Sequence, residues 1–172
     1  MKMAISSICF ALKTHLEAQD NPVDIAGKPL RALPVASPEV IDQCEHALGF
    51  ALPPLLKAIY LNVANGSFGP GYGIGSAMGL VNLYRFCMEP DPAEPRDEWC
   101  PTWLAFCDWG CNVHSVIACA QADYPVFFYD PLSLLDNEEA SLASIYKSSP
   151  KRPLAQWFEA WMAGTDFWQV GY

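Results

Sequence analysis

The chain has 172 residues, of which 52% are hydrophobic and 17% are charged. This composition excludes a disordered chain and is typical of one globular domain with a sizeable core. Its 10 basic and 19 acidic residues give a formal net charge of −9, which argues against direct contact with nucleic acid or an anionic membrane and favours a basic protein partner.

Cysteine content and the N-terminal sequence indicate the compartment. The seven cysteines, an odd number, include several in apolar runs, as free thiols of a reducing cytoplasm do. Residues 1–20 contain a short apolar stretch interrupted by Lys13 and His15, which does not fit a signal peptide. No run of ~18 apolar residues occurs, so we expect no membrane-spanning helix. We therefore expect a cytoplasmic protein.

The start of the chain predicts two helices joined by a connector. Apolar residues recur at helical spacing from Ile5 to Leu16, which indicates an amphipathic helix. Residues 20–36 are polar and contain three prolines, so we expect a surface loop. Ser37 can cap a second helix, and Gly49 can end it in the left-handed conformation.

The sequence pattern changes after a third helix, which is expected to begin at Pro53–Pro54 and to end at Asn65–Gly66. Residues 68–75 hold four of the eleven glycines. Residues 80–86 are short and apolar enough for a strand. Residues 88–101 are rich in proline and acidic groups, and this composition predicts a loop.

The second half of the chain predicts an antiparallel meander followed by a helix. The expected strands are 103–107, 112–119 and 126–129. Turns at 108–110 and 121–125 separate them. Residues 136–147 are expected to form a short helix or loop, and 153–163 a helix capped by Gly164. Helices, then strands, then a helix predict an α+β fold with a single domain and a mainly antiparallel sheet.

Four segments follow one another in a specific order: IDQCEHALGFALPPLLKAIYLNVANGSFGPGYGI, WLAFCDWGCNVHSVIACA, PVFFYDP and LAQWFEAWMAG. In this order they resemble the SUKH superfamily, in the branch named for a yeast cell-wall-assembly regulator (Smi/Knr-like). Together they extend over most of the chain between Ser37 and Gly164. The N-terminal part of that family is variable, so the resemblance predicts nothing about the structure of residues 1–36.

The resemblance implies a curved sheet with helices packed on it and a binding role. Many bacterial members of the superfamily are thought to be immunity proteins that neutralise secreted toxins, and the family has no accepted catalytic residues. We expect one compact domain overall, with an N-terminal helix and connector at 1–36 and a SUKH-like α+β region at 37–172.

Several thiols and one imidazole are the first candidates for a metal site or a catalytic site. Zinc prefers four soft ligands with closely spaced pairs, and the candidates are Cys100, Cys107, Cys111, His114 and Cys119. Cys111 with His114 could also form a nucleophile and its base. The competing interpretation is a set of buried core thiols with one turn residue. We favour this interpretation, and expect no metal and no cofactor.

The glycines between Gly69 and Gly75 do not form a nucleotide loop, because such a loop follows a strand and opens a helix. This segment follows a predicted helix, and its spacing is not GxGxxG. The glycines are better explained by tight backbone turns close to the sheet, with Tyr72 held over it.

Acidic groups beside aromatic residues are the stronger candidates for binding. Charge steers the approach of a basic partner, and an exposed aromatic side chain anchors it. The predicted partner-binding residues are Glu89, Asp91, Glu94, Asp97, Glu98, Trp99, Tyr72, Asp108, Asp136, Glu138 and Glu139. A plain solvated loop is the alternative for the acidic segment.

The sequence thus predicts a protein-binding module without catalytic residues, an immunity-type protein whose partner is a basic toxin domain. We expect a monomer or weak homodimer. The alternatives are a regulatory or scaffold domain with a housekeeping partner, and a small metal-binding protein or enzyme that uses the Cys107–His114 region.

Overall fold

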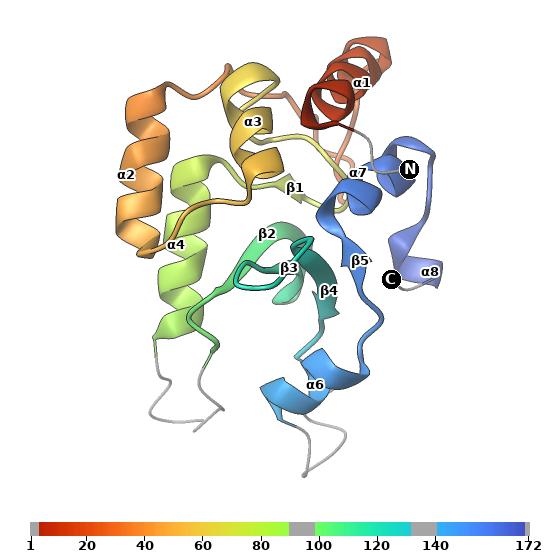
Figure 1. Ribbon diagram of the computed structural model, residues 1–172. Coiled ribbons are helices and arrows are strands. Elements are labelled where there is room, and N and C mark those ends of the chain that lie inside the picture. The colour runs from red at the N-terminus through yellow and green to blue at the C-terminus, as the bar shows by residue number, and fades with distance from the viewer. Residues whose placement is uncertain (1–3, 90–98, 132–140, 171–172) are drawn as a thin grey trace.

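An antiparallel sheet with the strand order β1-β2-β3-β4-β5 runs through the centre of the protein (Figure 1). The computed structural model describes residues 4–89, 99–131 and 141–170. Its strands are β1 (Gly73–Ile74), β2 (Trp103–Gly110), β3 (Val113–Ala118), β4 (Pro125–Tyr129) and β5 (Arg152–Pro153). Each strand pairs with the next one in the chain, which confirms the predicted meander and the α+β fold.

Helices pack on both faces of this sheet. They are α1 (Ile5–Ala18), α2 (Pro38–Leu48), α3 (Pro54–Asn62), α4 (Ala77–Met88), α6 (Leu142–Ser148), α7 (Leu154–Met162) and α8 (Phe167–Val170). In Figure 1, α6 lies on the opposite side of the strands from α1 and α3. The two faces therefore have separate hydrophobic cores.

The predicted ends of α2 are confirmed. The Ser37 hydroxyl accepts a hydrogen bond from the Val40 amide at 3.4 Å, and Pro38 occupies the first helical position, where its missing N–H costs nothing. Gly49 ends the helix with a left-handed φ of 80°, a conformation that glycine adopts without steric cost.

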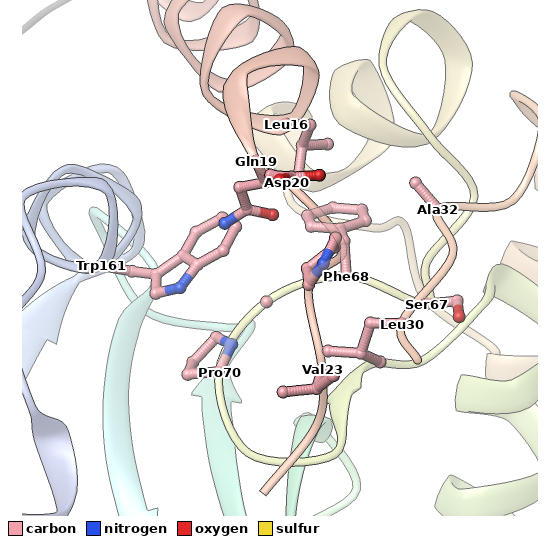
Figure 2. Close-up of a pocket in the computed structure, with 12 residues that line it drawn as sticks. Leu16, Gln19, Asp20, Val23, Leu30, Ala32, Ser67, Phe68, Pro70 and Trp161 are labelled. Carbon is pink, nitrogen blue, oxygen red and sulfur yellow. The ribbon is translucent and has the colours of Figure 1, made fainter. Parts of the chain in front are cut away.

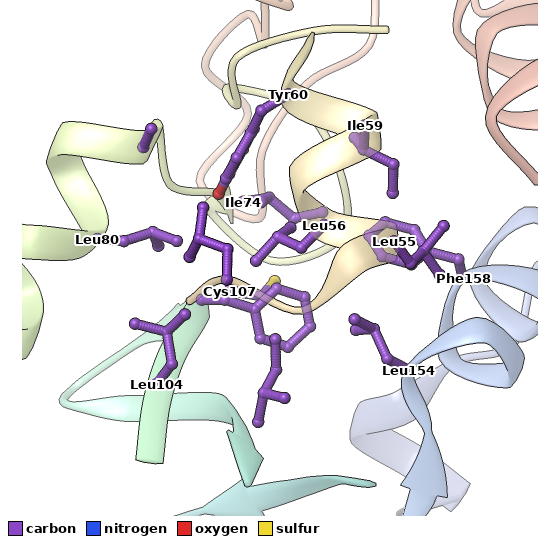
Figure 3. Packing of buried hydrophobic residues seen from close by; sticks show 14 of the residues in the cluster. Leu55, Leu56, Ile59, Tyr60, Ile74, Leu80, Leu104, Cys107, Leu154 and Phe158 are labelled. Carbon is purple, nitrogen blue, oxygen red and sulfur yellow. The ribbon is translucent and has the colours of Figure 1, made fainter. Parts of the chain in front are cut away.

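The larger core joins α3 and α7 to the sheet (Figure 3). Phe106 of β2 meets the indole of Trp157 edge to face, with ring centroids 4.9 Å apart. Trp157 also stacks on Phe167 at 5.2 Å. Each such buried side chain contributes roughly 1.5–3 kcal/mol of transfer free energy, so α7 is held to the sheet mainly by aromatic packing.

A bulge in β2 decides which side chains enter the larger core. Successive residues of a strand point to opposite faces, yet Phe106 and Cys107 both lie in the larger core. The register between β2 and β3 shifts between Ala105 and Cys107, and this extra residue turns Cys107 to the same face as Phe106.

Residues 80–86 are helical, so the predicted strand there is wrong. They belong to α4, whose first turn is capped by the Ser76 hydroxyl, which accepts a hydrogen bond from Gly79 N at 3.1 Å. Leu80 and Val81 enter the larger core, while Leu83 packs on the smaller one. The apolar positions fit a helical spacing of i, i+1, i+3 and i+4, but the segment is short enough for either interpretation.

The hairpin between β2 and β3 turns later than predicted. Strand β2 continues through Gly110, and the turn residues are Cys111 and Asn112, with φ values of 51° and 61°. Two central residues with positive φ are typical of the tight turns that match the twist of paired strands. The predicted turn at 108–110 is therefore wrong by a few residues.

The segment from Asn65 to Gly75 links α3 to the sheet and to α4. Helix α3 ends at Asn62, earlier than predicted, and the Asn65 side chain accepts a hydrogen bond from Ala77 N at 2.9 Å. The Tyr60 hydroxyl donates to Gly75 O at 2.7 Å. These bonds hold the glycine segment in a closed loop.

Gly66 is the position in this loop where glycine is required. Its φ is +83°, and a Cβ atom there would lie 2.6 Å from the backbone carbon and oxygen of Gly75. Both the conformation and the contact exclude a larger residue, because backbone atoms cannot move aside as a flexible side chain can.

We therefore expect Gly66→Ala to lower the free energy of unfolding by about 2 kcal/mol more than Gly27→Ala does. Gly27 is the matched control, since its φ is +77° but no atom lies within 4 Å of the added Cβ. Urea unfolding of both variants measures the difference. Equal losses would show that the backbone approach at Gly66 contributes nothing.

Candidate binding site

An open pocket of about 450 Å³ lies between the end of α1, the connector, the loop 67–70 and α7 (Figure 2). Its lining residues are Leu16, Gln19, Asp20, Pro22, Val23, Leu30, Ala32, Ser67, Phe68, Gly69, Pro70 and Trp161. This volume lies within the range of about 300–1,000 Å³ that is usual for ligand sites.

The connector sequence explains one wall of the pocket. Asn21 adopts a φ of 48° and reverses the chain after α1, which asparagine tolerates better than most residues. The Asp24 carboxylate then accepts hydrogen bonds from Ala26 N and Lys28 N, both at 2.8 Å. This tight turn returns the chain so that Leu30 lines the pocket.

Two aromatic rings form the opposite wall. Trp161 of α7 meets the His15 ring edge to face at 5.0 Å and lies tilted against Phe68 at 6.1 Å. Phe68 is buried, whereas Trp161 is only partly buried. The indole therefore has fixed neighbours and still exposes part of its ring to the pocket.

Gln19 and Asp20 supply the polar groups at one end of the pocket, next to Leu16 (Figure 2). The Gln19 amide nitrogen lies 3.1 Å from His15 Nε2. The Asp20 carboxylate accepts a hydrogen bond from the Asn21 side chain at 2.8 Å and is exposed to solvent. Among the described lining residues, Asp20 carries the single charge.

Five exposed apolar side chains lie on the connector and on the neighbouring glycine segment. We call them the connector surface, and they are Val23, Ile25, Leu33, Val35 and Tyr72, each between 41% and 56% exposed. The backbone beneath them is fixed, since Ile25 N donates to Gly71 O at 2.9 Å and Leu33 N donates to Gly66 O at 3.1 Å. The connector is therefore bonded to the glycine loop.

Tyr72 and Asp108 are the two predicted binding residues that the structure brings together. Tyr72 N donates to Asp108 O at 2.7 Å, and the Tyr72 ring packs so close to Gly110 that a Cβ there would lie 2.8 Å from it. The Asp108 side chain is 50% exposed and accepts a hydrogen bond from Gly110 N. The expected position of Tyr72 over the sheet is thus found.

Of the remaining predicted acidic residues, Glu89 is the one that lies within the described part of the chain. Glu89 is exposed at the end of α4, about 18 Å of helix away from the glycine loop. The other predicted acidic residues lie outside the described residues: Asp91, Glu94, Asp97, Glu98, Asp136, Glu138 and Glu139.

Trp99 is buried rather than exposed, so its expected role as an exposed anchor needs correction. It is 7% exposed, and its indole N–H donates to Trp103 O at 3.0 Å. Its ring meets those of Trp103 and Tyr129 edge to face. The large apolar area of the indole and its satisfied N–H make the smaller core the favourable place for it.

The candidate thiols do not converge. Cys107 faces the larger core and donates to Pro70 O at 3.3 Å, and burial raises the pKa of its thiol. Burial also raises the pKa of Cys119 to about 12, whereas Cys111 is exposed at the hairpin turn. The part of the chain that the structure describes contains no group of three or more His, Cys, Asp or Glu side chains able to hold a metal ion.

His114 lies on the face opposite Cys107, beside Asp108. The alternation of β3 places it with Val116 on the side of the smaller core. Its Nδ1 is 3.8 Å from the Asp108 carboxylate and has no hydrogen-bond partner among the described residues. Burial lowers the pKa of His114, and the Asp108 charge opposes this effect in part.

The sequence pattern of the SMI1 / KNR4 family (SUKH-1) matches residues 35–164. No curated protein is similar enough to the chain to count as a match. None of the helices in the described ranges has the length and apolar content needed to span a bilayer. The pocket combines residues inside the matched range, such as Phe68 and Trp161, with residues of α1 and the connector that precede it.

We expect the wild-type protein to lose stability more steeply than His114→Gln as the pH falls below about 6.5, the ordinary pKa of histidine. The folded-state pKa is lowered, so the unfolded chain binds the extra proton first and acid favours unfolding. The additional slope is at most about 1.4 kcal/mol per pH unit. Urea unfolding between about pH 5 and pH 8 measures it.

The exposed His46 of α2 provides the control for that experiment. His46→Gln also removes one imidazole, so it is the variant against which the slope of His114→Gln is read. If His114→Gln showed the wild-type slope, the neutral buried imidazole would have no part in acid stability.

Proposed function

The chain belongs to the SMI1 / KNR4 family (SUKH-1), and on this premise we propose that it is a protein-binding module that acts without catalysis. More specifically, we propose an immunity-type protein that neutralises a bacterial toxin domain by covering it. The family relationship supports the general binding role. The toxin partner is our inference from charge and surface.

The connector surface is the observation that carries this proposal. Its members are large apolar side chains that remain 41–56% exposed on a backbone fixed to the glycine loop. Folding gains nothing from leaving such groups in water, and a group of them beside a pocket is typical of a protein interaction site. A backbone that is already ordered before binding also reduces the conformational entropy lost on binding.

Charge supports a basic partner. The net charge of −9 would steer a basic toxin domain toward the protein and speed encounter at low salt. Asp108 and Glu89 expose carboxylates in the described part of the chain. We propose that the acidic residues between 89 and 98 and between 136 and 139 add to this field and to the contact.

We expect Ile25→Asp to weaken binding of the proposed toxin partner by at least about tenfold, because it places a charge among the exposed apolar side chains of the connector surface. Phe86→Asp is the matched control, since Phe86 is 59% exposed but lies on α4. Titration calorimetry at low salt measures affinity, and growth of cells that express the toxin measures protection.

Three outcomes separate the possibilities. Protection by the wild type and by Phe86→Asp, with its loss in Ile25→Asp, would support the proposal. A wild type that neither binds nor protects would overturn the immunity role and leave the regulatory or scaffold alternative. Full protection by Ile25→Asp would remove the connector surface from the contact.

A further inference from the structure

The chemistry of the pocket differs between its two ends. Trp161 and Phe68 offer aromatic surface on its sides, whereas Gln19 and Asp20 offer oxygen atoms at one end. The described lining residues include no Lys, Arg or His. Lys28 and Arg31 belong to the connector but do not line the pocket.

This combination fits a cation better than an anion or a plain apolar group. An indole face attracts a cation most strongly among the aromatic side chains, and a carboxylate nearby supplies the opposite charge. An anion would meet the Asp20 charge with no basic lining residue to offset it, in a chain of net charge −9. An apolar ligand would donate no hydrogen bond to the oxygen atoms of Asp20 or Gln19.

The polar groups can also receive several hydrogen bonds at once. The Asp20 carboxylate uses one oxygen for the Asn21 side chain, and a carboxylate has about four lone-pair sites in all. The Gln19 amide nitrogen, which is a donor, is engaged with His15, and the amide oxygen is the atom that can accept from a ligand. A planar guanidinium with five N–H donors matches such a set of acceptors better than an ammonium does.

We propose that this pocket is a binding site for an arginine side chain of the partner protein. The guanidinium lies against the Trp161 ring and donates hydrogen bonds to Asp20 and Gln19, while the aliphatic part of the side chain contacts Val23 and Pro70. This inference rests on the proposed function, since it names the group that the toxin domain inserts beside the connector surface. The volume of about 450 Å³ has room for a whole side chain.

A small probe tests the site without the partner. N-acetyl-arginine N-methylamide is titrated into the full-length protein, and the backbone amide signals are followed by nuclear magnetic resonance. We expect saturable shifts centred on Gln19, Ser67 and Gly69, with a dissociation constant of about 1–10 mM. The matching citrulline compound has nearly the same shape but no charge, and it should shift these signals at least about threefold less at equal concentration.

Variants assign the effect to named groups. Asp20→Asn keeps the shape and the acceptor for Asn21, and it should weaken the probe at least about threefold. Trp161→Leu should abolish the saturable shifts, because it removes the aromatic surface. Asp42→Asn is the control that changes the net charge equally, since Asp42 is exposed on α2 and does not line the pocket.

The proposal would be overturned by any of three results: no saturable shift at the lining amides up to about 50 mM probe, equal binding of the citrulline compound, or wild-type affinity in Asp20→Asn. Failure here is distinct from failure of the immunity role. If the toxin domain binds the wild type and Asp20→Asn equally, the pocket lies outside the contact and the proposed function stands. If the probe binds but no toxin domain does, the guanidinium site is supported and the immunity role is overturned.

Discussion

The close approach of the loop 66–75 to itself is the constraint on which the rest of the structure depends. Gly66 lies directly against the backbone of Gly75, and Gly75 N in turn donates to Phe106 O of β2 at 3.0 Å. The same loop aligns β1 on β2 and leads into α4, and Asn65, just before the loop, accepts a hydrogen bond from Ala77 N in the first turn of that helix. A single backbone arrangement therefore sets the edge of the sheet, the start of a helix and one wall of the pocket.

The connector surface depends on this loop although most of its residues come from elsewhere in the chain. The connector has few buried side chains of its own, and it is positioned by hydrogen bonds to Gly66 and Gly71. The family pattern begins at residue 35, so the loop and Trp161 belong to the matched region while Asp20 and Ile25 do not. The matched region thus supplies the scaffold, whereas the side chains of the proposed contact come mainly from α1 and the connector.

Local signals predicted much of the fold, and the errors occur where tertiary contacts decide. Ser37 and Gly49 bound α2 as their cap preferences predict, and the strands of the meander were found by their apolar runs. Residues 80–86 were misjudged because a short apolar run fits a strand or a buried helix equally. The pocket could not be predicted, because Leu16, Phe68 and Trp161 are far apart in sequence. Spacing places Trp161 on the same helical face as the fully buried Trp157, so only the packed structure distinguishes the partly buried indole from the core one.

Strand geometry also explains why the residues that looked most suited to chemistry are separated. The bulge before Cys107 turns its thiol into the larger core, whereas the regular alternation of β3 places the His114 ring on the other face of the sheet. Burial then disfavours the charged form of each group, raising the thiol pKa and lowering the imidazole pKa. A thiolate and an imidazolium are therefore both suppressed where these side chains lie. The accessible polar groups of Asp20, Gln19 and Asp108 lie instead beside exposed apolar or aromatic side chains, an arrangement that suits recognition of another molecule.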